Sequence, residues 1–207
     1  CTQVLERILH AARRPIEFRG MALTTSVSVG VSLYPADNSD PDTLLRHADQ
    51  AMYLAKQAGR NRYQLFDPES DRLSQQHREQ VARVRQGLRD GEFVLYYQPK
   101  VNFLSGKVVG VEGLARWQHP QRGLLPPAEF LAIVGAGELE QQFGEWVIEA
   151  GLRQLDAWRE RGLRLPVSVN ISANHLLRRD FAGSLERALA RHPSVPARDL
   201  ELEVLET

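Results

Sequence analysis

Strand-like and helix-like segments alternate along the second half of this chain, and this alternation constrains the fold more than any other feature. Strands are predicted over residues 107–114, 165–171 and 199–205. Helices are predicted around them, over residues 127–134, 138–161, 173–177 and 180–191. Strands that alternate with helices imply βα units and a parallel sheet, so the fold class is α/β. Because a whole (β/α)8 barrel needs about 250 residues, residues 76–207 could build only part of a TIM-like barrel.

The first part of the chain predicts a smaller unit that mixes helices and strands. Apolar residues at helical spacing predict helices over residues 2–13 and 41–58, and Gly59 ends the second. Alternating residues predict a half-buried strand over residues 25–33, and a second short strand follows over 61–66. The polar stretch Asp67-Pro-Glu-Ser-Asp71 then indicates a domain boundary.

A narrow apolar stripe beyond this boundary predicts a connecting helix that ends at Gly91. Residues 92–98 and 107–114 then form a predicted antiparallel hairpin, with Gly106 in its turn. We therefore expect a first domain over residues 1–68, a connecting helix over 69–91 and a second domain over 92–207.

Composition limits the classes of partner. The chain has 26 Lys and Arg and 26 Asp and Glu, so its net charge predicts no DNA or RNA binding by bulk attraction. Its only cysteine is Cys1, which excludes an intrachain disulfide and a cysteine-rich zinc site. No apolar run approaches about 18 residues, the length that spans a membrane. Because the chain begins with Cys1 rather than Met, we expect it to be an excerpt of a longer protein.

Oxygen-bearing side chains stand near the carboxyl ends of the three strands predicted to be parallel. These residues are Glu112, Asn170 and Glu203. Ligands of parallel α/β folds bind at that edge, and two carboxylates with an amide suit Mg²⁺ or Mn²⁺ better than zinc. The spacing alone leaves an alternative open, because a Glu or Asn at a strand end is often a helix cap or a solvated loop residue.

The local sequences around these residues form an ordered series. Tyr96-Tyr-Gln-Pro99 precedes Glu112-Gly-Leu-Ala-Arg116, and Val169-Asn-Ile-Ser172 and Leu200-Glu-Leu-Glu-Val-Leu-Glu206 follow. This series resembles the EAL family of cyclic di-GMP phosphodiesterases, which have a TIM-like barrel. The segments Ser28-Val-Gly-Val31, Ala48-Asp-Gln-Ala-Met-Tyr53 and Gly59-Arg-Asn-Arg-Tyr63 resemble the second half of a GGDEF domain, which has the diguanylate cyclase fold.

The resemblance implies roles for individual residues. Glu112, Asn170 and Glu203 match ligands of one of two divalent cations, and Glu112 is thereby implied to be catalytic. Arg116, interpreted as one helical turn beyond Glu112, matches an arginine that holds a substrate phosphate; the alternative is a surface ion pair.

Further matches concern the nucleotide. Gln98 and Leu114 match residues that line the nucleotide groove, although Gln98 could simply end an edge strand. In the first domain, Lys56 and Arg60 match basic residues that reach nucleotide phosphates, and a structural role is almost as well supported. The GGDEF signature itself would lie before Cys1, so the residues present support no cyclase activity.

The chain departs from the family at two positions. Gly113 replaces the alanine of Glu-Ala-Leu, and Leu205 stands where the family often has threonine. The family's paired aspartates, its lysine and its later glutamate would follow Thr207, and three ligands for one cation cannot make a two-metal site. We therefore expect the 207-residue chain alone not to hydrolyse cyclic di-GMP and its second half to be unstable. Turnover to pGpG that Glu112→Ala abolishes would contradict this.

The resemblance implies that the parent protein is a Mg²⁺- or Mn²⁺-dependent hydrolase that opens cyclic di-GMP to pGpG. Two alternatives remain open: a non-catalytic module that binds cyclic di-GMP or a partner protein, and a bifunctional cyclase and phosphodiesterase. The same resemblance implies a cytoplasmic location and sensor domains before Cys1. It also allows a membrane anchor in that preceding region and a homodimer formed through the EAL domain.

Overall fold

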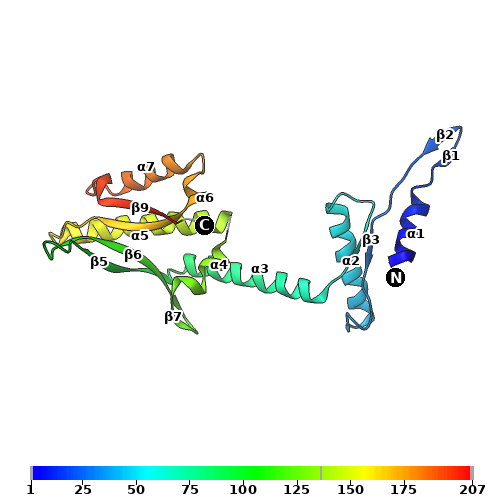
Figure 1. The fold of residues 1–207 in the computed structure, drawn as a ribbon, viewed down its shortest axis with the longest axis horizontal. Helices are drawn as coiled ribbons and strands as arrows, with labels where there is room; N and C mark the ends of the chain where they lie inside the picture. Colours follow the sequence, from blue (N-terminus) through cyan, green and yellow to red (C-terminus); the bar gives the residue numbers. More distant parts are fainter. Residues whose placement is uncertain (1, 136, 206–207) are drawn as a thin grey trace. The chain divides into compact units, whose positions relative to one another are not determined.

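The computed structural model describes residues 2–135 and 137–205 of the chain. Contacts between Cα atoms divide it into a first unit over residues 1–76 and a second unit over 77–207. Figure 1 shows the order of the elements along the chain. Among the described residues, no helix is both long and apolar enough to cross a membrane.

The first unit is built around a parallel βαβ arrangement. Its elements are α1 (Thr2–Ala12), β1 (Ile16–Phe18), β2 (Met21–Leu23), β3 (Val29–Val31), α2 (Pro41–Gln57) and β4 (Tyr63–Leu65). β1 pairs with β2 antiparallel, and β3 pairs with β4 parallel. Helix α2 lies so close to β3 that a Cβ added at Gly30 would stand 1.8 Å from the Ala48 carbonyl oxygen.

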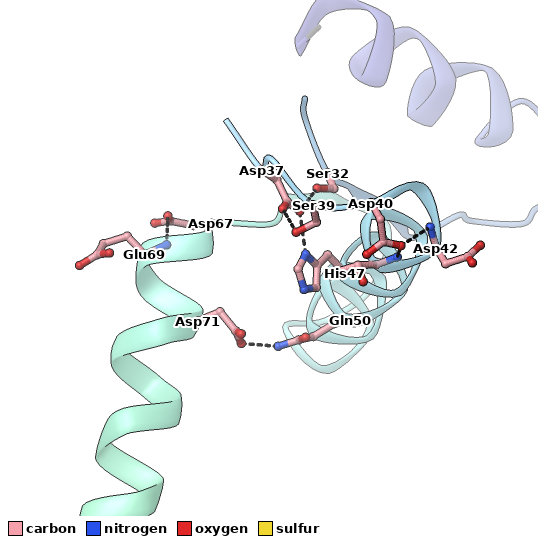
Figure 2. Close-up of polar contacts among 11 residues, drawn as sticks. Ser32, Asp37, Ser39, Asp40, Asp42, His47, Gln50, Asp67, Glu69 and Asp71 are labelled. Carbon is pink, nitrogen blue, oxygen red and sulfur yellow. Dashed lines mark hydrogen bonds and ion pairs between the residues drawn. The ribbon is translucent and has the colours of Figure 1, made fainter. Parts of the chain in front are cut away.

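A buried carboxylate, Asp37, organises the segment between β3 and α2 (Figure 2). It accepts hydrogen bonds from the hydroxyls of Ser32 at 2.5 Å and Ser39 at 2.7 Å, and its Oδ2 lies 2.7 Å from His47 Nδ1. The hydrogen bonds from Ser32 and then Ser39 lower the pKa of Asp37 to about 2. The His47 ring in turn stacks on Phe66, with ring centroids 4.0 Å apart. The carboxylate thus joins the loop to the helix.

The start of α2 agrees with the sequence prediction. Asp40 Oδ1 accepts hydrogen bonds from the backbone N–H groups of Asp42 and Thr43, each at 3.1 Å, and Pro41 follows the cap (Figure 2). An aspartate cap followed by proline satisfies the free donors of a first helical turn.

The connecting helix is α3 (Pro68–Arg89). It begins inside the polar stretch from which a domain boundary was predicted. The Asp67 carboxylate accepts a hydrogen bond from Glu69 N at 3.1 Å, and Asp71 accepts one from Gln50 Nε2 at 2.6 Å. Polar residues at a helix start serve as caps, so the stretch that indicated a domain boundary also forms the first turn of the connecting helix.

The second unit contains a five-stranded mixed sheet with strand order β5-β6-β8-β9, and β7 pairs with β6. The strands are β5 (Phe93–Val101), β6 (Val108–His119), β7 (Gly123–Leu125), β8 (Val167–Ser172) and β9 (Leu200–Leu205). β5 and β7 are antiparallel to β6, whereas β6, β8 and β9 run parallel. Three parallel strands with helical connections agree with the predicted α/β fold and partial barrel.

Helices cover one face of this sheet. They are η1 (Pro127–Glu129), α4 (Leu131–Val134), α5 (Glu138–Glu160), α6 (Ala173–Leu176), α7 (Phe181–Arg191) and η2 (Ala197–Asp199). α5 packs on β8, and α7 packs on α5 (Figure 1). Val111, Val167, Val169 and Ile171 are buried and belong to the main hydrophobic core. The helices therefore occupy the apolar face and leave the opposite, polar face of the sheet uncovered by them.

Several strands differ from the sequence prediction. The strand predicted over 25–33 is only β3, because its partner β4 offers three residues for pairing. The hairpin of β1 and β2 was not predicted, since its short strands are exposed on both faces. β6 continues to His119 rather than ending at Leu114, because β5 pairs with it as far as Trp117 and β7 pairs with its last residues.

Gly144 brings α5 against a buried histidine. A Cβ at this position would lie 2.1 Å from Nδ1 of His175, which is 3% exposed. We expect Gly144→Ala to lower the free energy of unfolding by about 1–3 kcal/mol through overpacking. In a His175→Ala background the same change should cost less, because the clash is gone and alanine favours a helix. Urea unfolding of the four variants measures this coupling, and additive effects would contradict it.

His192, 8% exposed, joins α5 to the end of α7. Its Nδ1 lies 2.5 Å from Asp156 Oδ2 and its Nε2 lies 3.0 Å from Glu149 Oε1. Burial alone would lower the pKa of His192, but the hydrogen bonds to Asp156 and Glu149 outweigh it, and the pKa is raised.

We therefore expect the NMR titration of His192 to give a pKa above its ordinary value of 6.5. A raised pKa stabilises the fold fully below the ordinary pKa, and this stabilisation is lost as pH rises through the folded-state pKa. Asp156→Asn should lower the measured pKa, and His192→Asn should weaken the fall of the melting temperature as pH rises above 6.5. An NMR pKa below 6.5 would contradict this.

Candidate functional site

The three predicted metal ligands lie on neighbouring parallel strands. Glu112 is in β6, Asn170 in β8 and Glu203 in β9, and all three side chains are half-buried. Asn170 is in register with Glu203, and Glu112 is in register with Ser168, two residues before Asn170. Because side chains alternate along a strand, this register places all three ligands on the polar face of the sheet.

Two of the ligands are in direct contact. The Asn170 amide donates a hydrogen bond from Nδ2 to Glu112 Oε1 at 2.9 Å. A half-turn of the amide would present its oxygen beside the same carboxylate. A carboxylate and an amide oxygen on adjacent strands are the donor types that bind Mg²⁺ or Mn²⁺.

The third ligand, Glu203, is held by a lysine. Lys100 Nζ in β5 lies 2.5 Å from Glu203 Oε1 and 3.6 Å from Glu201 Oε2. The hydrogen bond from Lys100, with a smaller contribution from Ser168, lowers the pKa of the Glu203 carboxyl. The same hydrogen bond raises the pKa of Lys100. Glu203 is thus an ionised carboxylate with a cation already beside it.

The donor atoms of Glu112, Asn170 and Glu203 are of the types that bind a divalent cation, but the three side chains do not surround a single point. Within the described ranges, no three His, Cys, Asp or Glu side chains are grouped so that they could hold a metal ion. The position of the Lys100 ammonium at Glu203 nevertheless shows that this carboxylate accepts a positive charge. We conclude that Glu112, Asn170 and Glu203 fit Mg²⁺ or Mn²⁺ by donor type and by strand position.

A cavity of about 570 Å³ opens beside this edge of the sheet. Glu112, Leu114 and Asn170 line it, and Phe143 and Val147 of α5 form part of its mostly apolar wall. A cavity of this size with a few convergent polar groups is typical of a small-molecule site.

The residues expected to contact the nucleotide occupy different places. Gln98 in β5 pairs with Glu112 across the β5–β6 ladder and is exposed, whereas Leu114 is half-buried at the cavity. The interpretation of Arg116 as one helical turn from Glu112 is wrong, because both residues belong to the extended strand β6. Four strand residues span about 13 Å, so Arg116 shares a face with Glu112 but not a contact.

The Arg116 side chain has its own local partners. Its NH1 donates to the Ala115 carbonyl oxygen at 2.8 Å, and its guanidinium carbon stands 5.9 Å from the centre of the Tyr96 ring. Among the described residues Arg116 has no ion-pair partner, and it makes a cation–π contact with Tyr96.

The two basic residues of the first unit do not share a helix face. Lys56 lies in the last turn of α2, which ends at Gln57. Arg60 lies beyond the helix in a left-handed backbone conformation with φ 58°. Both side chains are exposed.

Sequence reasoning missed Lys100. The spacing from Gln98 was a usable signal. Side chains alternate along a strand, and Lys100 follows Gln98 by two residues, so both lie on the same face of β5. The partner could not be predicted in the same way, since β5 and β9 are not neighbours in the sheet.

Comparison with known proteins agrees with this architecture. Residues 81–207 match the family described as EAL domain, and residues 1–62 match the family described as diguanylate cyclase, GGDEF domain. PdeR of Escherichia coli (strain K12), a cyclic di-GMP phosphodiesterase, is 38% identical over 183 residues, covering 88% of this chain and 28% of that protein. MucR of Pseudomonas aeruginosa, a bifunctional diguanylate cyclase/cyclic di-GMP phosphodiesterase, is 36% identical over 203 residues, covering 98% of this chain and 30% of that protein.

The solved structures include a close counterpart of the second unit. The PaMucR phosphodiesterase in complex with c-di-GMP aligns with a TM-score of 0.58 and 38% identity, covering 62% of this chain and 52% of that chain. The chain spans less than a third of the length of the two curated relatives. The match over residues 81–207 shows that this chain belongs to the EAL domain family, and residues 1–62 ahead of it match the GGDEF family.

Proposed function

We propose that the protein containing these residues is a metal-dependent phosphodiesterase that opens cyclic di-GMP to pGpG. The observation that carries the proposal is the placement of Glu112, Asn170 and Glu203 on one face of three parallel strands, beside a cavity. The relatives support the substrate, because PdeR is named a cyclic di-GMP phosphodiesterase and the PaMucR structure is a c-di-GMP complex.

Glu112, Asn170 and Glu203 would hold a Mg²⁺ or Mn²⁺ ion. Such an ion supplies Lewis-acid chemistry and makes a bound water more acidic. The chain's own contribution is orientation: the hydrogen bond between Asn170 and Glu112 fixes one carboxylate, and the ladder of β8 and β9 places Glu203 next to Asn170. Fixed ligands reduce the cost of ordering the site when the cation binds.

Arg116 would bind a phosphate of the substrate. A guanidinium offers several donors in a fixed plane, which suits bidentate contact with phosphate oxygens. To do so Arg116 would leave the Ala115 carbonyl oxygen while its stem stays on β6. Gln98 and Leu114 would line the groove for the nucleotide, from opposite strands of the β5–β6 ladder.

A second candidate function is a module that binds cyclic di-GMP without turnover. The pairing of Glu203 with Lys100 favours it, because a metal ligand is then occupied by a side chain of the protein itself. The assays below separate the two candidates, since only the enzyme produces pGpG.

The first unit would contribute a nucleotide contact rather than catalysis. We place the GGDEF portion at residues 1–68, the connecting helix at 69–91 and the EAL portion at 92–207, in the cytoplasm. Lys56 and Arg60, both exposed at the end of α2, would reach nucleotide phosphates.

Removal of the Glu112 carboxylate tests the phosphodiesterase. In the whole protein with Mg²⁺ or Mn²⁺, we expect Glu112→Gln to lower kcat for pGpG formation at least about a hundredfold, because a charged ligand of the ion is lost. Anion-exchange chromatography of the products measures the rate. Glu160→Gln, an exposed change at the end of α5, is the matched control. Undiminished turnover by Glu112→Gln would contradict the proposal, and binding without any turnover would favour the second candidate.

Arg116 can be tested without turnover. We expect Arg116→Lys to weaken cyclic di-GMP binding about tenfold, because an ammonium cannot make the planar two-donor contact of a guanidinium. Isothermal titration calorimetry without divalent cations measures the affinity. Arg161→Lys, an exposed change beyond α5, should leave it unchanged. Equal affinities of the two variants would remove Arg116 from the substrate site.

A further inference from the structure

Lys100 bridges two strands that are not neighbours. It stands on β5, at one end of the strand order β5-β6-β8-β9, and its ammonium meets Glu203 and Glu201 on β9, at the other end. The contact therefore joins the two ends of the strand order on the polar face of the sheet. A long lysine stem can do this while its charged end remains partly solvated, and Lys100 is 36% exposed.

The polar face of the sheet is rich in carboxylates. Strand register places Glu112, Glu201 and Glu203 on it. Glu112 is bonded to a neutral amide, and the guanidinium of Arg116 is turned to the Ala115 carbonyl oxygen and the Tyr96 ring. Among the described residues, Lys100 is thus the basic side chain that pairs with the carboxylates of β9.

The ammonium and a metal ion would compete for the same oxygen. Mg²⁺ binds carboxylate oxygens at about 2.0–2.1 Å, and Lys100 Nζ already lies 2.5 Å from Glu203 Oε1. A cation at that oxygen would overlap the ammonium, and a cation at the other oxygen of the same carboxylate would be repelled by it.

We propose that Lys100 is an internal counter-ion of the metal site: it holds Glu203 when no divalent cation is bound and must leave for the cation to bind. This rests on the proposed function, since it assumes that Glu203 is a metal ligand. Lys100 is a positioning residue, which sets the affinity for the cation through its charge.

Mn²⁺ binding to the whole protein that contains these residues tests the proposal directly. Electron paramagnetic resonance counts free Mn²⁺ without any need for turnover. We expect Lys100→Met to lower the Mn²⁺ dissociation constant about threefold to fivefold, the scale of ion pairs with this exposure. Lys100→Arg keeps the charge and should retain the original affinity. Lys107→Met, an exposed change across the turn of the same hairpin, is the matched control.

The outcomes separate this inference from the proposed function. If Glu203→Gln abolishes Mn²⁺ binding but Lys100→Met behaves like Lys107→Met, the metal site stands and the counter-ion is overturned. Weaker binding by Lys100→Met also overturns it, because Lys100 would then assist the cation. If no variant shows Mn²⁺ binding that depends on Glu203, the metal site of the proposed function fails and the counter-ion with it.

Discussion

The parallel pairing of β6, β8 and β9 is the constraint on which the site depends. Each strand contributes one of the proposed oxygen ligands, and the register of the two ladders brings Glu112, Asn170 and Glu203 to one edge and one face. A slip by one residue in β8 would turn Asn170 toward α5 and bury a polar amide among valines. The buried face enforces the register, because Val167, Val169 and Ile171 pack into the core from alternate positions of the same strand. Hydrophobic packing on one face of the sheet thereby fixes the positions of the polar side chains on the other face.

The carboxylates of this edge are compensated in two different ways. Glu112 accepts a hydrogen bond from a neutral amide, whereas Glu203 meets an ammonium. An unpaired carboxylate in a half-buried position would be costly, so both partners stabilise the chain without a metal ion. The two partners would respond differently to a metal ion. The amide can rotate and become a ligand, whereas the ammonium can only move away.

Much of the fold could be predicted from the sequence because the patterns are local. Alternation around Val108 and Val167 and helical spacing over residues 138–161 identified the βα order, and the strand ends identified Glu112, Asn170 and Glu203. Arg116 was misplaced because a spacing of four is shared by helix and strand, and only the pairing of Phe93 with Trp117 shows that the strand continues. The contact of Lys100 with Glu203 depends on the order of strands in the sheet, which no local pattern contains.

The strands of the site also differ in how soon they can find their partners. β5 and β6 are joined by the short turn of residues 102–107, so their ladder closes a small loop. β6 pairs with β8 only after the intervening residues 120–166, and β9 follows after α6, α7 and η2. Because loop-closure entropy grows with the separation of the segments, local hairpins form before long-range parallel pairs. During synthesis, Lys100 and Glu112 would thus be in place on a finished hairpin before Asn170 and Glu203 arrive, and the lysine would be ready when the last carboxylate docks.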